Sequence, residues 1–318
     1  MRRSTTWLLM TLHVVLAAVN YVAAKGATQH FASMGALTMT RAALSAVVLL
    51  ALTGTVIPRP HFTPREWLHV AGLGFLLVPL NQYLFLLGLR DTAPGHAALL
   101  YAMTPLGVLL LQSALHRRSP PAGKWVAVLV ALAGVFLILR PWAADDPHFR
   151  EIRTGDAWIA AGAVVWVVIT VATVPLVREH DPRTVTAWSL IAGALLLLPF
   201  TVGDVAATDF AALPSEAWWG LASLVLVASC VMMLLWNALL RHLHPVEVSV
   251  CTNAQPVVTA AFTASLHALG HPVADSDIGA PFWAGTALVV TGVALAQRRG
   301  ASPVPDGDGD ARTAAETP

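Results

Sequence analysis

Polar and aromatic side chains lie within long apolar runs of this chain, where they could bind a small molecule. His13 lies inside the first run and Glu247 near the start of a later one, where an imidazole or a carboxyl group could exchange a proton. The other candidates offer hydrogen bonds or aromatic surface: Asn20, Asn81, Tyr101, Thr104, Trp166, Thr170, Trp236, Asn253 and Gln255. These residue types suggest non-covalent binding, with proton coupling as an option, rather than bond cleavage.

Each candidate also has a structural explanation. A polar side chain in hydrocarbon either bonds to a neighbouring helix or lines a watery cavity, and helix packing is the simpler explanation for each residue alone. Glu247 in a first helical turn would also interact favourably with the helix dipole. For Arg41, anchoring at an interface or bonding to carbonyls competes with contact to a substrate. Taken together, the candidates favour a cavity, because six of the ten apolar runs carry them.

Enzymatic chemistry finds little support in the sequence. There is no HExxH, GxSxG or Walker A sequence, so we expect no catalytic residue, metal, cofactor or ATP engine. Cys230 and Cys251 fall inside apolar runs and are expected to be free, small hydrophobes. An intramembrane hydrolase or lipid-modifying transferase remains an alternative, as does a non-transporting receptor or structural subunit.

The composition indicates that a lipid bilayer surrounds the elements that position these residues. Charged residues make up 12% of the chain and hydrophobic residues 56%, whereas soluble domains have about 25% charged residues. The apolar runs match the roughly 20 residues that cross a bilayer as a helix. We expect an all-α membrane protein in contact with lipid and not with nucleic acid, with spans near 6–26, 34–52, 67–88, 94–115, 124–139, 156–177, 185–200, 217–240, 246–268 and 282–296.

The two halves of the chain carry matching marks. The segment at 89–105, LRDTAPGHAALLYAMTP, and the segment at 240–256, LRHLHPVEVSVCTNAQP, share the spacing of one arginine and two prolines. Trp125 precedes Gly134 by nine residues, and Trp283 precedes Gly292 by nine. Five crossings, an odd number, separate the two copies. The sequence therefore predicts ten spans as two inverted five-helix repeats.

Lysine and arginine residues predict the orientation. With the N-terminus in the cytoplasm, thirteen of them lie inside and four outside, which is a strong positive-inside bias. Both termini are then cytoplasmic. The expected organisation is a first repeat at 6–139, an extracytoplasmic linker at 140–155, a second repeat at 156–296 and a disordered tail at 297–318.

Motifs spread over nearly all of the chain carry a resemblance to a known family: Asn20–Lys25, Arg41 and the segments 88–106, 155–156, 186–199, 234–258 and 285–295. With these motifs the chain resembles an EamA-type member of the drug/metabolite transporter superfamily. Spans four and nine of this family often end in Gly-Glu, whereas residues 115–118 (LHRR) and 269–272 (LGHP) contain no glutamate, so no role of that glutamate is carried over.

The resemblance and the inverted repeat together predict a secondary carrier in the cell membrane. It would move a small metabolite or drug-like molecule by alternating access, outward, and without chemistry on the substrate. Protons are the candidate coupling ion, through His13 or Glu247. Spans five and ten, rich in Ala and Gly, would serve as scaffold or as contact with a second copy in a homodimer.

Overall fold

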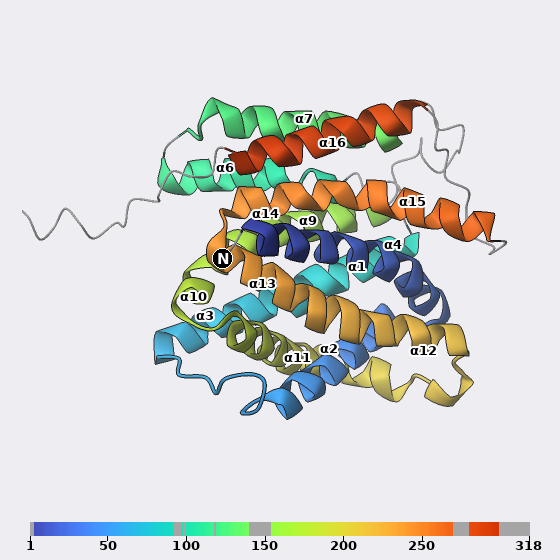
Figure 1. Cartoon of the computed structure of the whole chain (residues 1–318). Coiled ribbons are helices and arrows are strands. Elements are labelled where there is room, and N and C mark those ends of the chain that lie inside the picture. Colours follow the sequence, from blue (N-terminus) through green and yellow to red (C-terminus); the bar gives the residue numbers. More distant parts are fainter. Residues whose placement is uncertain are drawn as a thin grey trace, which may run out of the picture.

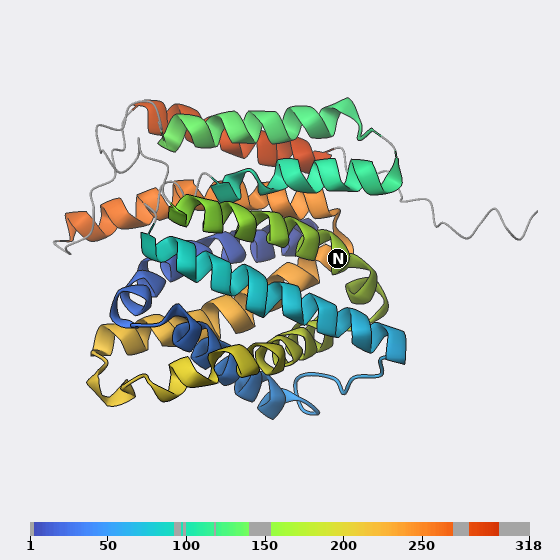
Figure 2. The same cartoon turned by 180° about the vertical axis from the view of Figure 1, so that it is seen from behind.

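The computed structural model describes residues 3–91, 97, 100–117, 119–139, 154–269 and 280–298. The predicted tail from residue 299 onward and most of the predicted linker, 140–153, lie outside these ranges. The described chain is almost entirely helical, and its helices lie side by side in one bundle (Figure 1 and Figure 2). The class predicted from composition, an all-helical membrane protein, agrees with this architecture.

The helices follow one another along the chain with short connections. The first half contains α1 (Arg3–His30), α2 (Met34–Leu52), α3 (Pro64–Phe75), η1 (Leu76–Gln82), α4 (Tyr83–Asp91), α6 (Thr104–His116) and α7 (Ala122–Leu139). The second half contains α9 (Thr154–Ala172), α10 (Val174–Glu179), α11 (Pro182–Ala206), η2 (Phe210–Ala212), α12 (Ser215–Ala222), η3 (Ser223–Met232), α13 (Met233–His242), α14 (Pro245–Cys251), η4 (Thr252–Ala254), α15 (Gln255–Ala268) and α16 (Ala280–Arg298).

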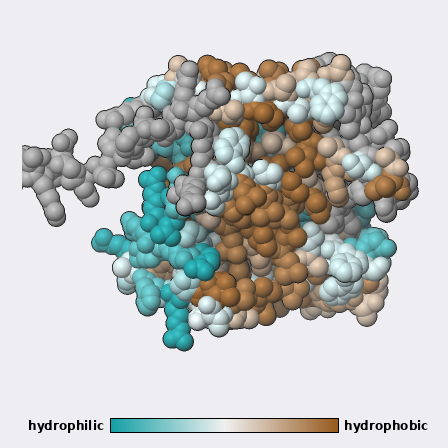
Figure 3. Space-filling model, viewed as in Figure 1, coloured by the Kyte–Doolittle hydropathy of each residue, from teal (hydrophilic) through white to brown (hydrophobic). Residues whose placement is uncertain are grey.

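Among the described residues, five helical stretches are long and apolar enough to cross a membrane: 34–51, 64–91, 154–179, 182–206 and 215–242. Four shorter apolar helices cover 4–20, 100–116, 122–138 and 280–296. Apolar side chains form a broad area over the middle of the bundle, and hydrophilic side chains gather at its left end (Figure 3). This distribution is the one that a bilayer imposes on the outside of a helical bundle.

Two predicted spans are distorted at their centres. The stretches 64–91 and 215–242 each have 28 residues, and each contains a π-helical segment, η1 in the first and η3 in the second. Pro79 lies inside η1 and has no N–H to donate, which accounts for a widened turn there. The sequence of η3 contains no proline, so its widened turn has another cause.

Three other predicted spans change helix at a proline. A turn at Met103 precedes α6, which has Pro105 at its start, and Thr173 separates α9 from α10, where Pro175 is in the first turn. The predicted span 246–268 is interrupted by the 3-10 turn η4, just before Pro256. A proline has no N–H for the carbonyl four residues before it, and its ring clashes with that carbonyl, which explains why the continuous spans expected at these places are broken.

Helices from the two halves pack against each other in antiparallel pairs. Where α2 begins, Ser33 Oγ donates to Asp204 Oδ2 near the end of α11 at 2.8 Å. Near the beginning of α11, Thr184 Oγ1 donates to the Pro58 carbonyl, which follows α2, at 3.0 Å. The start of each helix therefore lies beside the end of the other.

The pair α7 and α16 is held by a contact that occurs twice. A Cβ atom added to Gly134 would lie 2.6 Å from the carbonyl oxygen of Gly285, and one added to Gly292 would lie 2.7 Å from that of Ala127. Only a hydrogen atom fits at either glycine, so the two backbones touch. When Trp125 is aligned with Trp283, Ala127 and Gly285 are matching positions. The same contact is thus made once in each direction.

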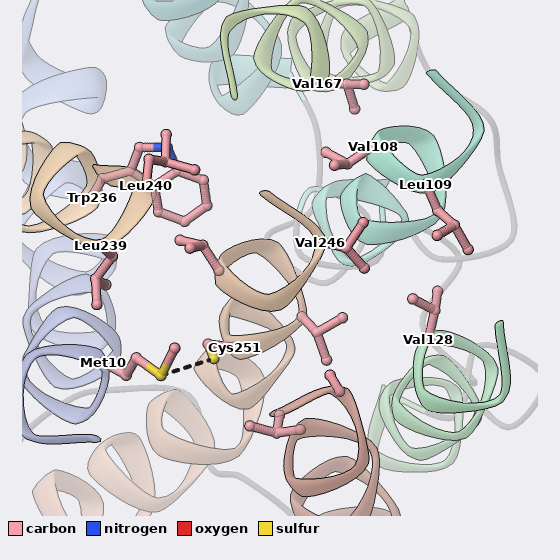
Figure 4. Close-up of a cluster of buried hydrophobic side chains, with 14 of the residues drawn as sticks. Met10, Val108, Leu109, Val128, Val167, Trp236, Leu239, Leu240, Val246 and Cys251 are labelled. Carbon is pink, nitrogen blue, oxygen red and sulfur yellow. Dashed lines mark hydrogen bonds between the residues drawn. The ribbon is translucent and has the colours of Figure 1, made fainter. Parts of the chain in front are cut away.

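The first helix of each half packs on the other half. α1 contacts α12, η3 and α15, while α9 contacts α4, η1 and α6. Figure 4 shows part of the resulting core, where Met10 of α1 meets Cys251 of α14 with their sulfur atoms 3.4 Å apart. Cys230 and Cys251 are both free and buried. The halves are consequently interlocked rather than merely placed side by side.

Candidate functional site

Asn81 joins three segments at the middle of the bundle. It lies in η1 and is 7% exposed. Its Nδ2 donates to the Tyr101 hydroxyl at 3.1 Å and to the carbonyl oxygen of Gly162, in α9, at 2.9 Å. The two predicted site residues Asn81 and Tyr101 are therefore in direct contact, and Asn81 also binds the backbone of the second half.

Arg41 forms a second contact between the halves. It lies in α2, its side chain is buried, and its Nε donates to Ser229 Oγ, in η3, at 2.9 Å. Tyr101 and Cys230 lie within electrostatic range of its guanidinium group. We call Arg41, Asn81, Tyr101 and Ser229 the central cluster. It connects both π-helical segments, and it places Arg41 away from the interface position that its sequence context also allowed.

Three aromatic rings from three helices form a group beside η3. The ring centroids of His13 and Trp236 are 5.5 Å apart, and those of Trp166 and Trp236 are 5.2 Å apart. Trp236 is 1% exposed and His13 is hydrogen-bonded to the carbonyl of Met232. The imidazole of α1 therefore contacts the backbone at the end of η3. Three predicted site residues therefore lie together here.

Other predicted residues are buried polar groups for which the described part of the chain supplies no hydrogen-bond partner. They are the hydroxyls of Thr104 and Thr170 and both amide atoms of Asn253. Buried polar atoms are nearly always paired with protein or with water. These three positions are thus suited to ordered water or to a bound ligand, and helix packing alone leaves them unsatisfied.

The last predicted residues lie elsewhere. Asn20 Oδ1 accepts from Ser223 Oγ at 3.0 Å, at the start of η3, and Gln255 is partly buried at the start of α15. Glu247 is buried within electrostatic range of Lys124 and next to His244. Burial, with the nearby charges of Lys124, Arg178 and His116, lowers the pKa of His244 to about 4. Glu247 therefore belongs to a charged group at one end of the bundle, and the structure does not bring it together with His13.

Sequence reasoning missed several hydroxyl groups. Ser229 and Ser223 bind two conspicuous polar residues, yet single serines within apolar helices give no pattern that a sequence can show. Asn237 follows the predicted Trp236 in α13, and its Nδ2 donates to Thr186 Oγ1 at 2.7 Å. Asn237 Oδ1 and Ser189 Oγ, both without a described partner, line a cavity of about 10 Å³. That volume is near the lower limit for one water molecule, which could bond to both atoms.

One group of ligand-type side chains could hold a metal ion by geometry alone. Ligand atoms of Glu66, Glu179 and His180 lie within 4.8 Å of one another at the end of the bundle. Glu66 accepts from the Thr63 N–H at 2.6 Å in a capping box and is paired with His180 Nε2 at 2.7 Å. The helix cap and the ion pair explain why the Glu66 carboxylate lies in this position, without a metal ion.

Duplicated helical halves joined through a buried polar centre define a polytopic membrane protein. The model of the EamA-like transporter family matches residues 5–140 and 153–297, once in each half. The chain belongs to this family. Its members are transporters and not enzymes, which agrees with the lack of catalytic motifs in the sequence.

Curated relatives are named as transporters, and one solved structure shares the fold. The chain is 24% identical over 213 residues to the uncharacterized transporter YyaM of Bacillus subtilis, covering 67% of each protein. It is 22% identical over 282 residues to an uncharacterized transporter of Synechocystis, covering 80% of this chain and 79% of the relative. One crystal structure, 21% identical, matches 94% of this chain and 99% of its own with a TM-score of 0.64, which supports the fold alone.

Proposed function

We propose that this transporter is a secondary carrier of ten transmembrane helices in two inverted five-helix repeats, at 6–139 and 156–296. The support comes from helices that match in the two repeats and nevertheless run antiparallel. α7 and α16 share the Trp–Gly spacing and exchange the same glycine contact in both directions. Two copies related in this way have an axis in the membrane plane, an arrangement that lets one structure open to either side.

The central cluster is the proposed substrate path, and one observation carries this assignment. Both spans that contain a π-helical segment make a polar contact with the opposite half at that segment. Asn81 of η1 binds Gly162 of α9, and Ser229 of η3 binds Arg41 of α2. Contacts of this kind must be exchanged when one half rocks against the other. A small molecule that replaces them would be coupled to the movement, which is the requirement of alternating access.

Transport assays on alanine variants test this path at Tyr101 of the central cluster and at two predicted site residues near η3, Asn20 and Trp166. Asn20→Ala, Tyr101→Ala and Trp166→Ala should each lower transport at least about tenfold, the factor given by roughly 1.4 kcal/mol of lost contact. Membrane abundance should stay near that of the wild type. Leu195→Ala is the control, because that side chain is 66% exposed on the outside of the bundle. If abundance falls in step with activity, these residues serve packing and the proposed path is wrong.

The proposed orientation places both termini in the cytoplasm and the linker 140–155 outside, with export from the cell across the plasma or inner membrane. The bias of thirteen basic residues against four supports it. In a Cys230→Ser, Cys251→Ser background, an impermeant thiol reagent should label Asp146→Cys in intact cells and leave Ser119→Cys unlabelled. Labelling of Ser119→Cys from outside would reverse the orientation, and with it the proposed direction.

Proton coupling is proposed to run through His13. Its imidazole lies between α1 and η3, so a proton there can alter a contact between the halves. His13→Gln should abolish accumulation driven by a proton gradient and leave substrate exchange intact, because exchange needs only the rocking movement. An unchanged pH dependence of uptake into vesicles would exclude His13 and make Glu247→Gln the next variant to examine.

A further inference from the structure

Arg41 brings a permanent positive charge into the interior of the bundle. Its side chain is 6% exposed, and Ser229, which accepts from its Nε at 2.9 Å, is fully buried. An arginine stays protonated in proteins and has five N–H donors in a planar fork. The bond to Ser229 uses Nε, which leaves the two terminal nitrogens at the end of the fork. Those two nitrogens form the pair that binds a carboxylate through two parallel hydrogen bonds.

The residues that the structure describes leave this charge without a counter-ion. The ionisable groups within electrostatic range are Tyr101 and Cys230, and a phenol and a thiol are ordinarily neutral near pH 7. No described acceptor binds the terminal nitrogens, and no described carboxylate forms an ion pair with Arg41. A buried charge without a partner is strongly destabilising, and in membrane proteins such charges pair with one another, with carbonyls or with a ligand.

The position of Arg41 matters as much as its charge. It belongs to the first half and binds η3 of the second half, while the nearby Tyr101 binds Asn81 of η1. An anion on the free end of the guanidinium would therefore lie close to groups of both halves. Phe85 packs edge-on against Tyr101, with 5.4 Å between ring centroids, so this side of the site is aromatic.

We propose that Arg41 binds the negative charge of the transported molecule, and that the substrate is a small organic anion with one carboxylate group. The inference rests on the proposed carrier function and names its substrate class. One buried cation compensates one negative charge, which suits a monocarboxylate better than a phosphate dianion. The planar fork of the guanidinium matches the planar carboxylate, and the aromatic side chains offer surface for an apolar body.

Metabolite profiling tests the substrate class without prior choice of a ligand. Cells that overexpress the wild type, Arg41→Gln or Arg41→Lys are compared with vector-only cells by untargeted mass spectrometry of medium and cell extract. The wild type should redistribute one or more monocarboxylates between cells and medium. At equal membrane abundance, Arg41→Gln should abolish this redistribution. Arg41→Lys should retain part of it, because an ammonium group keeps the charge and loses the fork.

The outcomes separate this inference from the carrier function on which it rests. A wild type that redistributes only neutral or cationic compounds overturns the anion site and leaves the carrier function standing. A wild type that redistributes nothing, in either direction, overturns the carrier function itself. Redistribution of monocarboxylates that is equally strong in Arg41→Gln removes Arg41 from the site.

A structural role for Arg41 is distinguished by its partner. If Arg41 only anchors α2 to η3, Ser229→Ala and Arg41→Gln should lower melting temperature and transport to the same extent. We expect Ser229→Ala to keep the preference for carboxylates. If Arg41→Gln does not fold, purified wild type and Arg41→Lys are compared in thermal-shift assays with the redistributed acid and its amide. The acid should raise the wild-type melting temperature and the amide should not. The acid should also raise the melting temperature of the wild type by more than that of Arg41→Lys. Equal shifts from acid and amide would refute the proposal.

Discussion

The two π-helical segments have the same place in the fold and different side chains. The stretches 64–91 and 215–242 have equal lengths, so position n of the first matches position n + 151 of the second. The distortion occurs at the middle of both, yet Asn81 is matched by Met232 and Pro79 by Cys230. The backbone distortion is thus repeated and the chemistry is not. In the proposed alternating-access movement both halves need a deformable centre, whereas one set of polar groups is enough at a shared site.

The pair α7 and α16 shows the opposite behaviour. Its contacts are repeated in both backbone and side chain, with Gly134 and Gly292 at matching positions. Close backbone contact through small residues is how helices associate in a membrane, where lipid and protein are equally apolar. Substitutions at matching positions should therefore have equal effects in this pair and unequal effects at the π-helical segments.

The largest effect is expected at the repeated glycines. Gly134→Leu and Gly292→Leu should each destabilise the protein by about 3 kcal/mol or more, because the new side chain forces the two backbones apart. Gly72→Leu is the control, since a Cβ atom there meets nothing within 4 Å. Melting temperature and size-exclusion profile in detergent measure the effect. If Gly134→Leu melts like Gly72→Leu, the close approach of α7 and α16 is wrong.

A smaller loss of stability is expected at Asn81. Asn81→Leu removes two donors and should cost about 1–2 kcal/mol, because the Gly162 carbonyl and the Tyr101 hydroxyl each lose a partner. Transport should fall at least about tenfold. Met232→Leu, at the matching position, should change stability by less than about 1.5 kcal/mol as a volume-conserving exchange. Equal effects of the two variants on transport would contradict the claim that only the backbone is repeated.

Removal of Pro79 should change movement more than stability. Pro79→Ala restores an N–H inside η1, so hydrogen exchange over residues 76–82 should slow and transport should fall severalfold. Cys230→Ala, at the matching place in η3, should leave hydrogen exchange and transport unchanged because η3 forms without a proline. Slower exchange in Pro79→Ala together with wild-type transport would show that η1 is not a hinge.

The smallest effect is expected at His244, which is matched by Ala93 in the first copy. The folded pKa of about 4 lies below the ordinary value of 6.5, so the folded state binds fewer protons between these values. The contribution of His244 to the free energy of unfolding is therefore complete above pH 6.5 and is lost as the pH falls towards 4. His244→Gln should flatten the decline of melting temperature over that range. A decline identical to that of the wild type would show that His244 does not titrate in this way.

Composition and spacing predicted the helical membrane class and the internal repeat, because apolar runs and repeated Arg, Pro and Trp marks survive in a single sequence, and the resemblance of several motifs predicted the family. The contacts at the centre could not be predicted. Arg41 and Ser229 are 188 residues apart, and their contact depends on how the halves pack. Pro79 gave a local signal for the distortion of one span, whereas nothing in residues 223–232 distinguishes η3 from an ordinary apolar helix. The polar residues were found by type, and their pairing required coordinates.

The exchange of first helices between the halves has a consequence for how the protein is made. α1 leaves the ribosome long before α12, η3 and α15, the elements on which it packs. Arg41 precedes Ser229 by 188 residues, and at about 5–20 residues per second its partner arrives about 10–40 s later. For that interval the first half is in the membrane without the second half. The charge of Arg41 must then be accommodated by the insertion machinery. Quality-control proteases should accordingly remove chains that stop after residue 139 and spare those that reach α16.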